Sequence, residues 1–229
     1  PYRRYIRCLE NADVSAAAGK EALENLWNNI LKGAKLCASI DPDAEPLMTD
    51  LGEFESEVLE LSPLVGELKM GDERAIHLAA NWKNSVENYS ECYHCPNQHP
   101  SLAQGSLDME SYQITVHKKY HSHASRGVGD ATGYKKAQDR DGEAREFGSW
   151  LLWPNWAVEV YPGGYLNVFY HLPTGPEEMV QICEWYFPTA ELSEEQQQVV
   201  EFINVVRDED IPLCETVQKG LHSRGYSQG

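Results

Sequence analysis

Two histidines and a nearby acid are the residues of this sequence best suited to chemistry. His94 and His99 stand five residues apart, and Glu91 lies shortly before the first of them. Two neutral imidazoles and one carboxylate form a facial triad that binds iron(II) and leaves positions on the metal open. Residues five apart in a helix point about 140° away from each other, at about 100° per residue. Pro96 cannot continue helical hydrogen bonding, so the chain can turn there and bring both rings to one point.

The motif around these histidines resembles a known metal-binding signature. It consists of three blocks in order: Glu87-Asn88-Tyr89, Glu91-Cys92-Tyr93-His94 and His99-Pro100. Together they are similar to the iron-binding signature of the large subunits of Rieske-type non-haem iron oxygenases. The similarity points to the branch that acts on quaternary ammonium compounds such as choline, glycine betaine, carnitine and stachydrine. This match is far more specific than a pair of histidines alone.

The resemblance implies a role for each of the three residues. His94 and His99 would ligate iron(II). In this family the electrons come from a Rieske [2Fe-2S] cluster on the neighbouring subunit of a trimer, which a reductase component reduces. They cross at a carboxylate between the two metal centres, and Glu91 occupies that bridging position, where many ring-hydroxylating relatives have Asp. The alternative for Glu91 is an ordinary exposed helical residue.

The last third of the sequence offers the carboxylate that the triad lacks. Ser193 and Gln196 form a capping box, which predicts the start of a helix. A second helix is predicted after it, with Pro212 in its first turn. Asp210 immediately precedes this second helix. From its position alone it is either an N-cap carboxylate or a metal ligand.

The resemblance favours the metal ligand. The segment carries the pattern Glu209-Asp210, Glu215 and Gln218-x-Gly220. It is similar to the family segment that holds the third iron ligand, and the match falls on Asp210. Asp208 and Glu209 are the fallback candidates.

Short β-like runs separated by Gly-rich breaks follow the histidines. They are Tyr112 to Tyr120, Phe147 to Trp153, Ala157 to Tyr161, Leu166 to Leu172 and Met179 to Pro188. This spacing predicts an α+β fold, an antiparallel meander with helices packed on one face. The resemblance implies the same architecture, since the family's catalytic domain is an antiparallel sheet of helix-grip type that covers the iron site.

Period-two alternation sorts one of these runs into two faces. Tyr165, Asn167, Phe169 and His171 share one face, and Leu166, Val168 and Tyr170 share the other. One of these faces should line the pocket.

Aromatic residues are dense between positions 150 and 170. Most of them fit a sheet core. A cage of aromatic rings is also how proteins hold a trimethylammonium group, which cannot donate hydrogen bonds. The substrate-binding candidates are Trp153, Tyr165, Asn167 and Phe169.

The resemblance divides the chain into two parts. Residues 1–38 are an unplaced N-terminal segment, predicted to be helical between Val14 and Leu36. Residues 39–229 are expected to be the mononuclear iron catalytic domain, truncated at its C-terminal end relative to the family.

Six cysteines are present, at positions 8, 37, 92, 95, 183 and 214, without the spacing of a disulfide scaffold. Cys92-x-His94 imitates half of a Rieske cluster motif, but no second Cys-x-x-His half follows. The resemblance implies a [2Fe-2S] cluster in the full-length protein, and no ligands for it are expected in this chain. Cys92 and Cys95 are expected to be half-buried helix residues. Without a signal peptide or an apolar run long enough to span a bilayer, a cytoplasmic location is expected.

The net charge of the chain narrows the range of its possible binding partners. With 19 basic and 36 acidic residues, the formal net charge is −17. This disfavours nucleic acid or an anionic membrane surface as a partner and mildly favours a cationic ligand.

Two further features have functional alternatives. His117, His121 and His123 would share one face of a strand and could hold a metal as three imidazoles, although the neighbouring lysines favour a solvated strand end. The segment Arg126 to Arg145 has the composition of a surface loop and could also act as a lid.

The sequence therefore predicts a mononuclear iron(II) oxygenase domain. It would use O2 to hydroxylate or N-demethylate a quaternary ammonium substrate, with electrons from a separate Rieske centre. Two alternatives remain: a redox-inactive helix-grip module that binds a small molecule, and a mononuclear zinc hydrolase that uses the same triad.

Overall fold

A computed structural model describes residues 51–126, 146–161 and 163–227 of the chain. The predicted N-terminal segment, and the loop predicted after Arg126, lie outside these residues. The described helical elements are α4 (Phe54–Leu61), the 3-10 turn η1 (Val65–Glu67), α5 (Trp82–Tyr89), α6 (Cys95–Gln98), α7 (Pro100–Gly105) and α9 (Glu194–Leu221). The described strands are β1 (Lys69–Leu78), β2 (Gln113–Val116), β3 (Tyr120–Arg126), β4 (Glu146–Leu152), β5 (Trp156–Tyr161), β6 (Tyr165–Gly175) and β7 (Glu178–Phe187).

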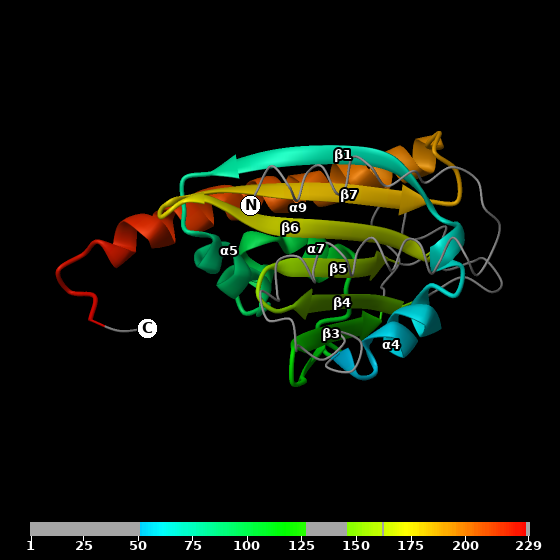
Figure 1. Cartoon of the computed structure of the whole chain (residues 1–229), viewed down its shortest axis with the longest axis horizontal. Coiled ribbons are helices and arrows are strands. Elements are labelled where there is room, and N and C mark those ends of the chain that lie inside the picture. Colours follow the sequence, from blue (N-terminus) through cyan, green and yellow to red (C-terminus); the bar gives the residue numbers. More distant parts are fainter. Residues whose placement is uncertain (1–50, 127–145, 162, 228–229) are drawn as a thin grey trace, which may run out of the picture.

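The seven strands form one antiparallel sheet (Figure 1). Their order is β1-β7-β6-β5-β4-β3-β2, so the strands from β2 to β7 form a meander and β1 joins its far edge. The prediction of an antiparallel sheet with helices is confirmed. The run predicted from Tyr112 to Tyr120 is instead strand β2 and a turn into β3.

The two faces of the sheet bury different clusters. Leu166, Val168 and Tyr170 of β6 pack in one cluster with Phe54 and Val58 of α4. The opposite face packs against the helices α5 and α9. The predicted alternation along β6 is therefore present, and it separates the α4 side from the side that carries the candidate site.

The helix α9 begins where its capping box predicts. The Ser193 hydroxyl accepts from the backbone N–H of Gln196, and the Gln196 side chain accepts from the N–H of Ser193. The prediction of two helices was wrong, because α9 continues through Pro212 to Leu221. Proline removes one backbone hydrogen bond, which does not end a helix that is buried on both sides of it. Asp210 is consequently an interior residue of α9 and not an N-cap.

A buried ion pair fixes the middle of α9 on the sheet. The Arg207 guanidinium lies 3.3 Å from Glu159 Oε2 of β5 and donates to Asn167 Oδ1 of β6. It also stacks 4.6 Å from the centre of the Phe169 ring. Burial raises the pKa of Glu159, and the positive charge of Arg207 opposes that shift. The pair therefore holds two charges that would be costly to bury singly.

The far half of α9 is tied to the helix α5. The Gln218 side-chain oxygen accepts from Asn84 Nδ2 at 2.9 Å and from the backbone N–H of Asn81 at 2.8 Å. Glu215 accepts from the backbone N–H of Ala79 at 3.0 Å. These bonds hold α9 beside α5, the helix that leads into the two histidines.

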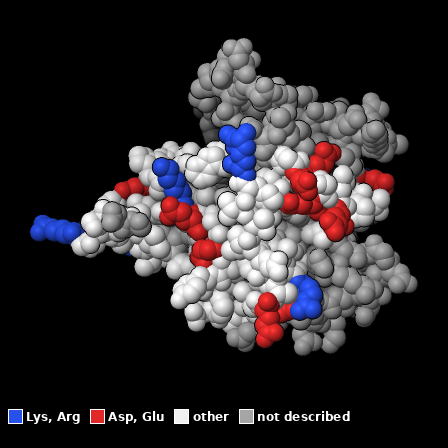
Figure 2. Space-filling view, turned by 90° about the horizontal axis from the view of Figure 1, so that it is seen from below, with Lys and Arg blue, Asp and Glu red and all other residues white. Residues whose placement is uncertain are grey.

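Charge is spread unevenly over the surface. On the face shown in Figure 2, the described basic side chains lie singly and the acidic side chains form small groups. Within the described ranges, no helix is both long enough and apolar enough to cross a lipid bilayer.

Two arginines form ion pairs between α9 and the sheet, one buried and one exposed. Replacing the buried one should reduce the stability of the protein much more than replacing the exposed one. Arg207→Met leaves Glu159 buried without its counter-charge, so the free energy of unfolding should fall by about 3–5 kcal/mol. Arg74→Met removes an ion pair with Asp208 whose partners are 33% and 51% exposed, and should cost no more than about 1 kcal/mol. Urea unfolding measures both, and equal losses would contradict a special role for the buried pair.

Candidate metal centre and its pocket

The segment that carries both histidines is a helix followed by a loop and two short helical turns. Asn81 caps α5 by accepting from the backbone N–H of Lys83. The helix ends at Tyr89, before His94, and Pro96 lies in the first turn of α6, where proline is tolerated. The expected turn at Pro96 is therefore displaced to the loop before His94. His99 lies at the junction between α6 and α7.

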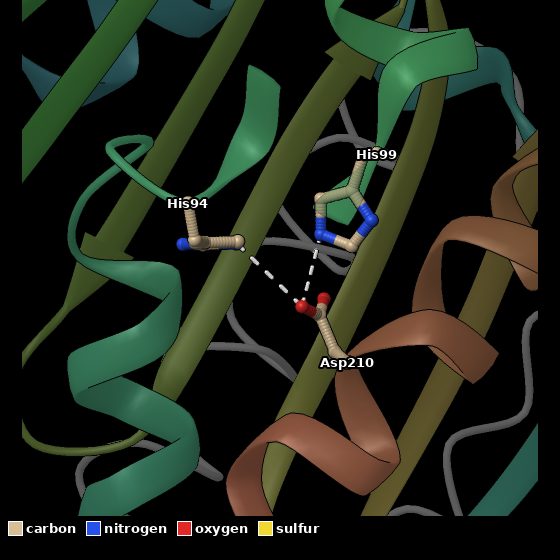
Figure 3. Close-up of side chains that lie close together, drawn as sticks. All are labelled: His94, His99 and Asp210. Carbon is tan, nitrogen blue, oxygen red and sulfur yellow. Dashed lines mark hydrogen bonds and ion pairs between the residues drawn. The ribbon is translucent and has the colours of Figure 1, made fainter. Parts of the chain in front are cut away.

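His94, His99 and Asp210 converge at one point (Figure 3). Asp210 Oδ1 lies 2.9 Å from His99 Nε2 and 3.6 Å from His94 Nε2. One ligand atom from each residue falls within 4.8 Å of the others. Among the described residues this is the one group of three such side chains that could hold a metal ion. Asn88 Nδ2 also donates to Asp210 Oδ1, at 3.0 Å, and so helps to hold the carboxylate.

A second carboxylate lies behind each histidine. Glu91 Oε1 is 2.5 Å from His94 Nδ1, and Glu209 Oε2 is 2.8 Å from His99 Nδ1. Each imidazole is thereby oriented with its Nε2 toward Asp210, as is usual where a carboxylate orients a metal-binding histidine. Burial would lower the pKa of His99, but its hydrogen bonds and charge interactions with Asp210 and Glu209 outweigh burial and raise the pKa.

The three consecutive acidic residues of α9 have different partners. Asp210 faces the two Nε2 atoms, and Glu209 lies on the far side of the His99 ring. Asp208 pairs with Arg74 of β1. Two imidazole nitrogens and one carboxylate oxygen are a donor set that fits iron(II).

Cys92 and Cys95 differ from expectation. They form a disulfide that flanks His94, whereas half-buried helix residues were expected. Cys92 lies in the loop after α5, and Cys95 is the first residue of α6. The loop between them brings the two sulfur atoms together. The cysteine spacing typical of disulfide-rich domains, which was the criterion applied to the sequence, does not detect such a local bond.

A pocket opens beside the triad, between the helices and the sheet. The triad and Glu91 form part of its lining. Aromatic side chains form another part: Tyr89, Tyr112, Phe147, Tyr161 and Phe169. Glu159 and Arg207 also line it, and their charges are paired with each other.

The four substrate-binding candidates lie in different places. Phe169 lines the pocket. Trp153 is 63% exposed and lies near Trp82, with ring centres 6.3 Å apart. Tyr165 packs on Phe187. Asn167 accepts from Arg207 and donates to the backbone carbonyl of Glu184, and it does not line the pocket.

The three strand histidines do not gather into a metal site in the described part of the chain. His117 stacks on Tyr120 with ring centres 4.1 Å apart. His121 and His123 lie side by side on β3, with ring centres 5.0 Å apart, and His123 lines the pocket beside the candidate metal centre.

Several pocket residues were not singled out from the sequence as site residues. Arg207 falls on the apolar face of α9, four residues after the buried Ile203, and a charge in an apolar stripe is a detectable signal. His171 was placed on the same face as Phe169 but was not named as a site residue. Tyr89 belongs to the matched motif, and only the fold shows that its ring enters the pocket.

Comparisons with known proteins show which family this chain belongs to. The family model of the ring hydroxylating alpha subunit (catalytic domain) matches residues 65–229. The carnitine monooxygenase oxygenase subunit of Escherichia coli (strain K12) is 36% identical over 190 residues, which cover 82% of this chain and 50% of that protein. The chloroplastic choline monooxygenase of Arabidopsis thaliana is 30% identical over 159 residues, 68% of this chain and 36% of that protein.

A solved structure shares the fold. It is described as a quaternary ammonium Rieske monooxygenase that gives insights into carnitine oxidation by gut microbiota and inter-subunit electron transfer. Its TM-score is 0.71 at 30% identity, over 82% of this chain and 50% of that chain. The chain therefore belongs to the ring-hydroxylating alpha subunit family, whose catalytic domain it matches. It spans about half the length of the carnitine monooxygenase subunit that it matches.

The carboxylate behind His99 should control metal affinity. Glu209→Ala removes the acceptor that orients His99, and metal affinity should fall about 10- to 100-fold. Asp208→Ala is the matched control, because its partner is Arg74 at the sheet edge. Anaerobic titration with iron(II) or cobalt(II) measures both dissociation constants. Equal changes in the two variants would show that Glu209 has no orienting role.

The buried histidine of β6 should make stability depend on pH. Burial, and then the charge of Arg207, lower the pKa of His171 to about 3. In the unfolded chain the value is about 6.5, so between these values the unfolded chain binds a proton that the folded chain does not. The free energy of unfolding should therefore fall with falling pH, by up to about 1.4 kcal/mol per pH unit from this residue.

Urea unfolding of the metal-free chain between pH 7 and pH 5 measures this slope. The variant His171→Asn should show a smaller slope of unfolding free energy against pH, reduced by about the contribution of one histidine. Parallel slopes for the variant and the wild type would contradict the assignment.

Proposed function

We propose that this chain is the catalytic part of a monooxygenase that uses iron(II) to oxidise a quaternary ammonium compound. His94, His99 and Asp210 would hold the metal. The observation that carries the proposal is the convergence of these side chains, each imidazole oriented by a carboxylate on its Nδ1 atom. The relatives named carnitine and choline monooxygenases support the substrate class.

Iron(II) would supply the activation of O2 that a hydroxylation or N-demethylation needs. The residues of the chain bind and orient the substrate beside it. Each aromatic face in the pocket attracts a quaternary ammonium group by roughly 0.5–2 kcal/mol. The ion pair of Arg207 with Glu159 leaves this wall of the pocket without net charge, so the rings can provide the main attraction for the cation.

Glu91 would serve as the electron bridge, and its contacts support this role. It contacts His94 Nδ1 on one side, and its side chain is 42% exposed on the other. Its carboxylate also accepts from the backbone N–H groups of Tyr93 and His94, which fixes its orientation. Electrons would arrive through Glu91 from a Rieske [2Fe-2S] centre on another subunit of a trimer, reduced by a reductase component.

Nitric oxide binding tests the metal site directly. The chain loaded anaerobically with iron(II) and exposed to nitric oxide should give a high-spin iron-nitrosyl signal in electron paramagnetic resonance. His94→Ala and Asp210→Ala should lose this signal, because each removes one of three ligands. His77→Ala, on the exposed side of β1, is the control and should keep it.

Other outcomes would contradict part or all of the proposal. An unchanged signal in Asp210→Ala would exclude this residue as the third ligand. Bound zinc with ester or peptide hydrolysis would support a hydrolase, and freshly purified anaerobic protein without iron would support a binding module.

A further inference from the structure

One histidine of the pocket lining has a buried ring nitrogen without a hydrogen-bond partner among the described residues. His123 is 2% exposed, lines the same pocket as the triad, and its Nε2 has no hydrogen-bond partner among the described residues. Buried polar groups are nearly always hydrogen-bonded, so such an atom at a ligand pocket indicates where a ligand supplies the missing partner. His123 belongs to neither the triad nor the electron bridge.

The neighbouring tyrosine determines which nitrogen of His123 carries the proton. Tyr112 Oη lies 2.6 Å from His123 Nδ1. Within the described ranges this hydroxyl bonds to no other group, so its proton is satisfied only if Tyr112 donates to Nδ1. Burial, and then the nearby charge of His121, lower the pKa of His123 to about 4, so the ring is neutral near pH 7. The single ring proton is therefore on Nε2, a buried donor of a pocket-lining residue that has no acceptor among the described residues.

Two aromatic rings of the pocket lie close to this donor or to each other. The Tyr89 ring stacks on His123 with ring centres 6.1 Å apart and meets the Phe169 ring edge-on at 5.0 Å. These two aromatic rings suit the cationic end of a substrate. Neither ring can accept a strong hydrogen bond from Nε2, so the acceptor must come from another part of the substrate.

We propose that His123 Nε2–H binds an oxygen acceptor, a carboxylate or hydroxyl, at the end of the substrate remote from its ammonium group. This inference rests on the proposed function, since it concerns the same pocket. It makes His123 a specificity-determining residue, with Tyr112 as the residue that positions its proton. The substrate is accordingly a two-ended molecule, with an ammonium group for the rings and an oxygen for His123.

Three ligands of matched length test the inference. γ-Butyrobetaine carries a carboxylate, 4-hydroxybutyl-trimethylammonium a hydroxyl, and pentyltrimethylammonium neither. Calorimetric titration of the 229-residue chain, loaded with iron(II) under argon, gives the dissociation constants. His123→Phe should weaken binding of at least one oxygen-bearing ligand about three- to tenfold and leave the alkyl ligand unchanged. The oxygen ligand that loses more identifies the group that His123 binds.

Two further variants separate binding from folding. Tyr112→Phe keeps the ring and frees His123 Nδ1 to take the proton, so it should weaken the same ligand by a smaller factor. His121→Phe removes the adjacent imidazole, which does not line the pocket, and should leave all three affinities unchanged. Circular dichroism establishes that each variant is folded. If His123→Phe does not fold, Tyr112→Phe alone decides.

The outcomes distinguish this inference from the proposed function. If His123→Phe changes the oxygen and alkyl ligands equally, His123 only shapes the pocket and the inference is overturned. If the wild type binds the alkyl ligand and neither oxygen ligand, the inference fails and the quaternary ammonium assignment stands. If the wild type binds none of the three, both fail.

Discussion

The buried contact of Arg207 with Glu159 and Asn167 determines where the long C-terminal helix can lie. A guanidinium in this position must keep its partners, because an unpaired charge inside the domain would cost several kcal/mol. The helix is thus held at one depth and one rotation over the sheet. Asp210 follows Arg207 by three residues, about one helical turn, so the same contact directs its carboxylate toward the two histidines. The position of the candidate metal site thus depends on an ion pair whose two residues are not among its candidate ligands.

The pocket beside the site has an uncommon balance of polar groups. On one side of it Arg207 and Glu159 pair their charges, and burial lowers the pKa of two lining histidines, His123 and His171, so that both are neutral near pH 7. On the Arg207 side, a cation that enters the pocket meets ring faces next to a pair of opposite charges. Charge is concentrated instead at the triad end, where Glu91, Glu209 and Asp210 surround two imidazoles. One end of the pocket suits a metal ion and the other suits a weakly hydrated organic cation.

Local signals in the sequence predicted local structure well. The capping box of Ser193 and Gln196 marks the true start of α9, and alternation along β6 separates the two faces of the sheet. The rings of His94 and His99 do lie close together, with centres 5.2 Å apart, although the chain turns in the loop before His94 and not at Pro96 as predicted. These features depend on residues within a few positions of each other, where the backbone geometry limits the possibilities.

The failures came where distant contacts override a local rule. Pro212 is a good helix start by itself, but Gln218 and Cys214 are buried beyond it, and the packing keeps α9 continuous. The interior position of Asp210 could not be derived while the helix was divided there. The partner of Arg207 lies 48 residues earlier, on a different element, so the sequence shows a charge in an apolar stripe without showing what neutralises it. The acid behind His99 was hidden for the same reason, since consecutive acids in a helix look alike until a partner distinguishes them.

The residues of the triad are far apart in the sequence, so the ribosome synthesises them at different times. His99 and Asp210 are 111 positions apart, and the sheet is formed almost entirely from the residues between them. During synthesis the two histidines emerge first and have no carboxylate opposite them until α9 follows. A metal with three protein ligands can therefore be loaded only after nearly the whole domain has left the ribosome. Once bound, it would close a loop of more than a hundred residues and link the segment of α6 and α7 to the helix α9.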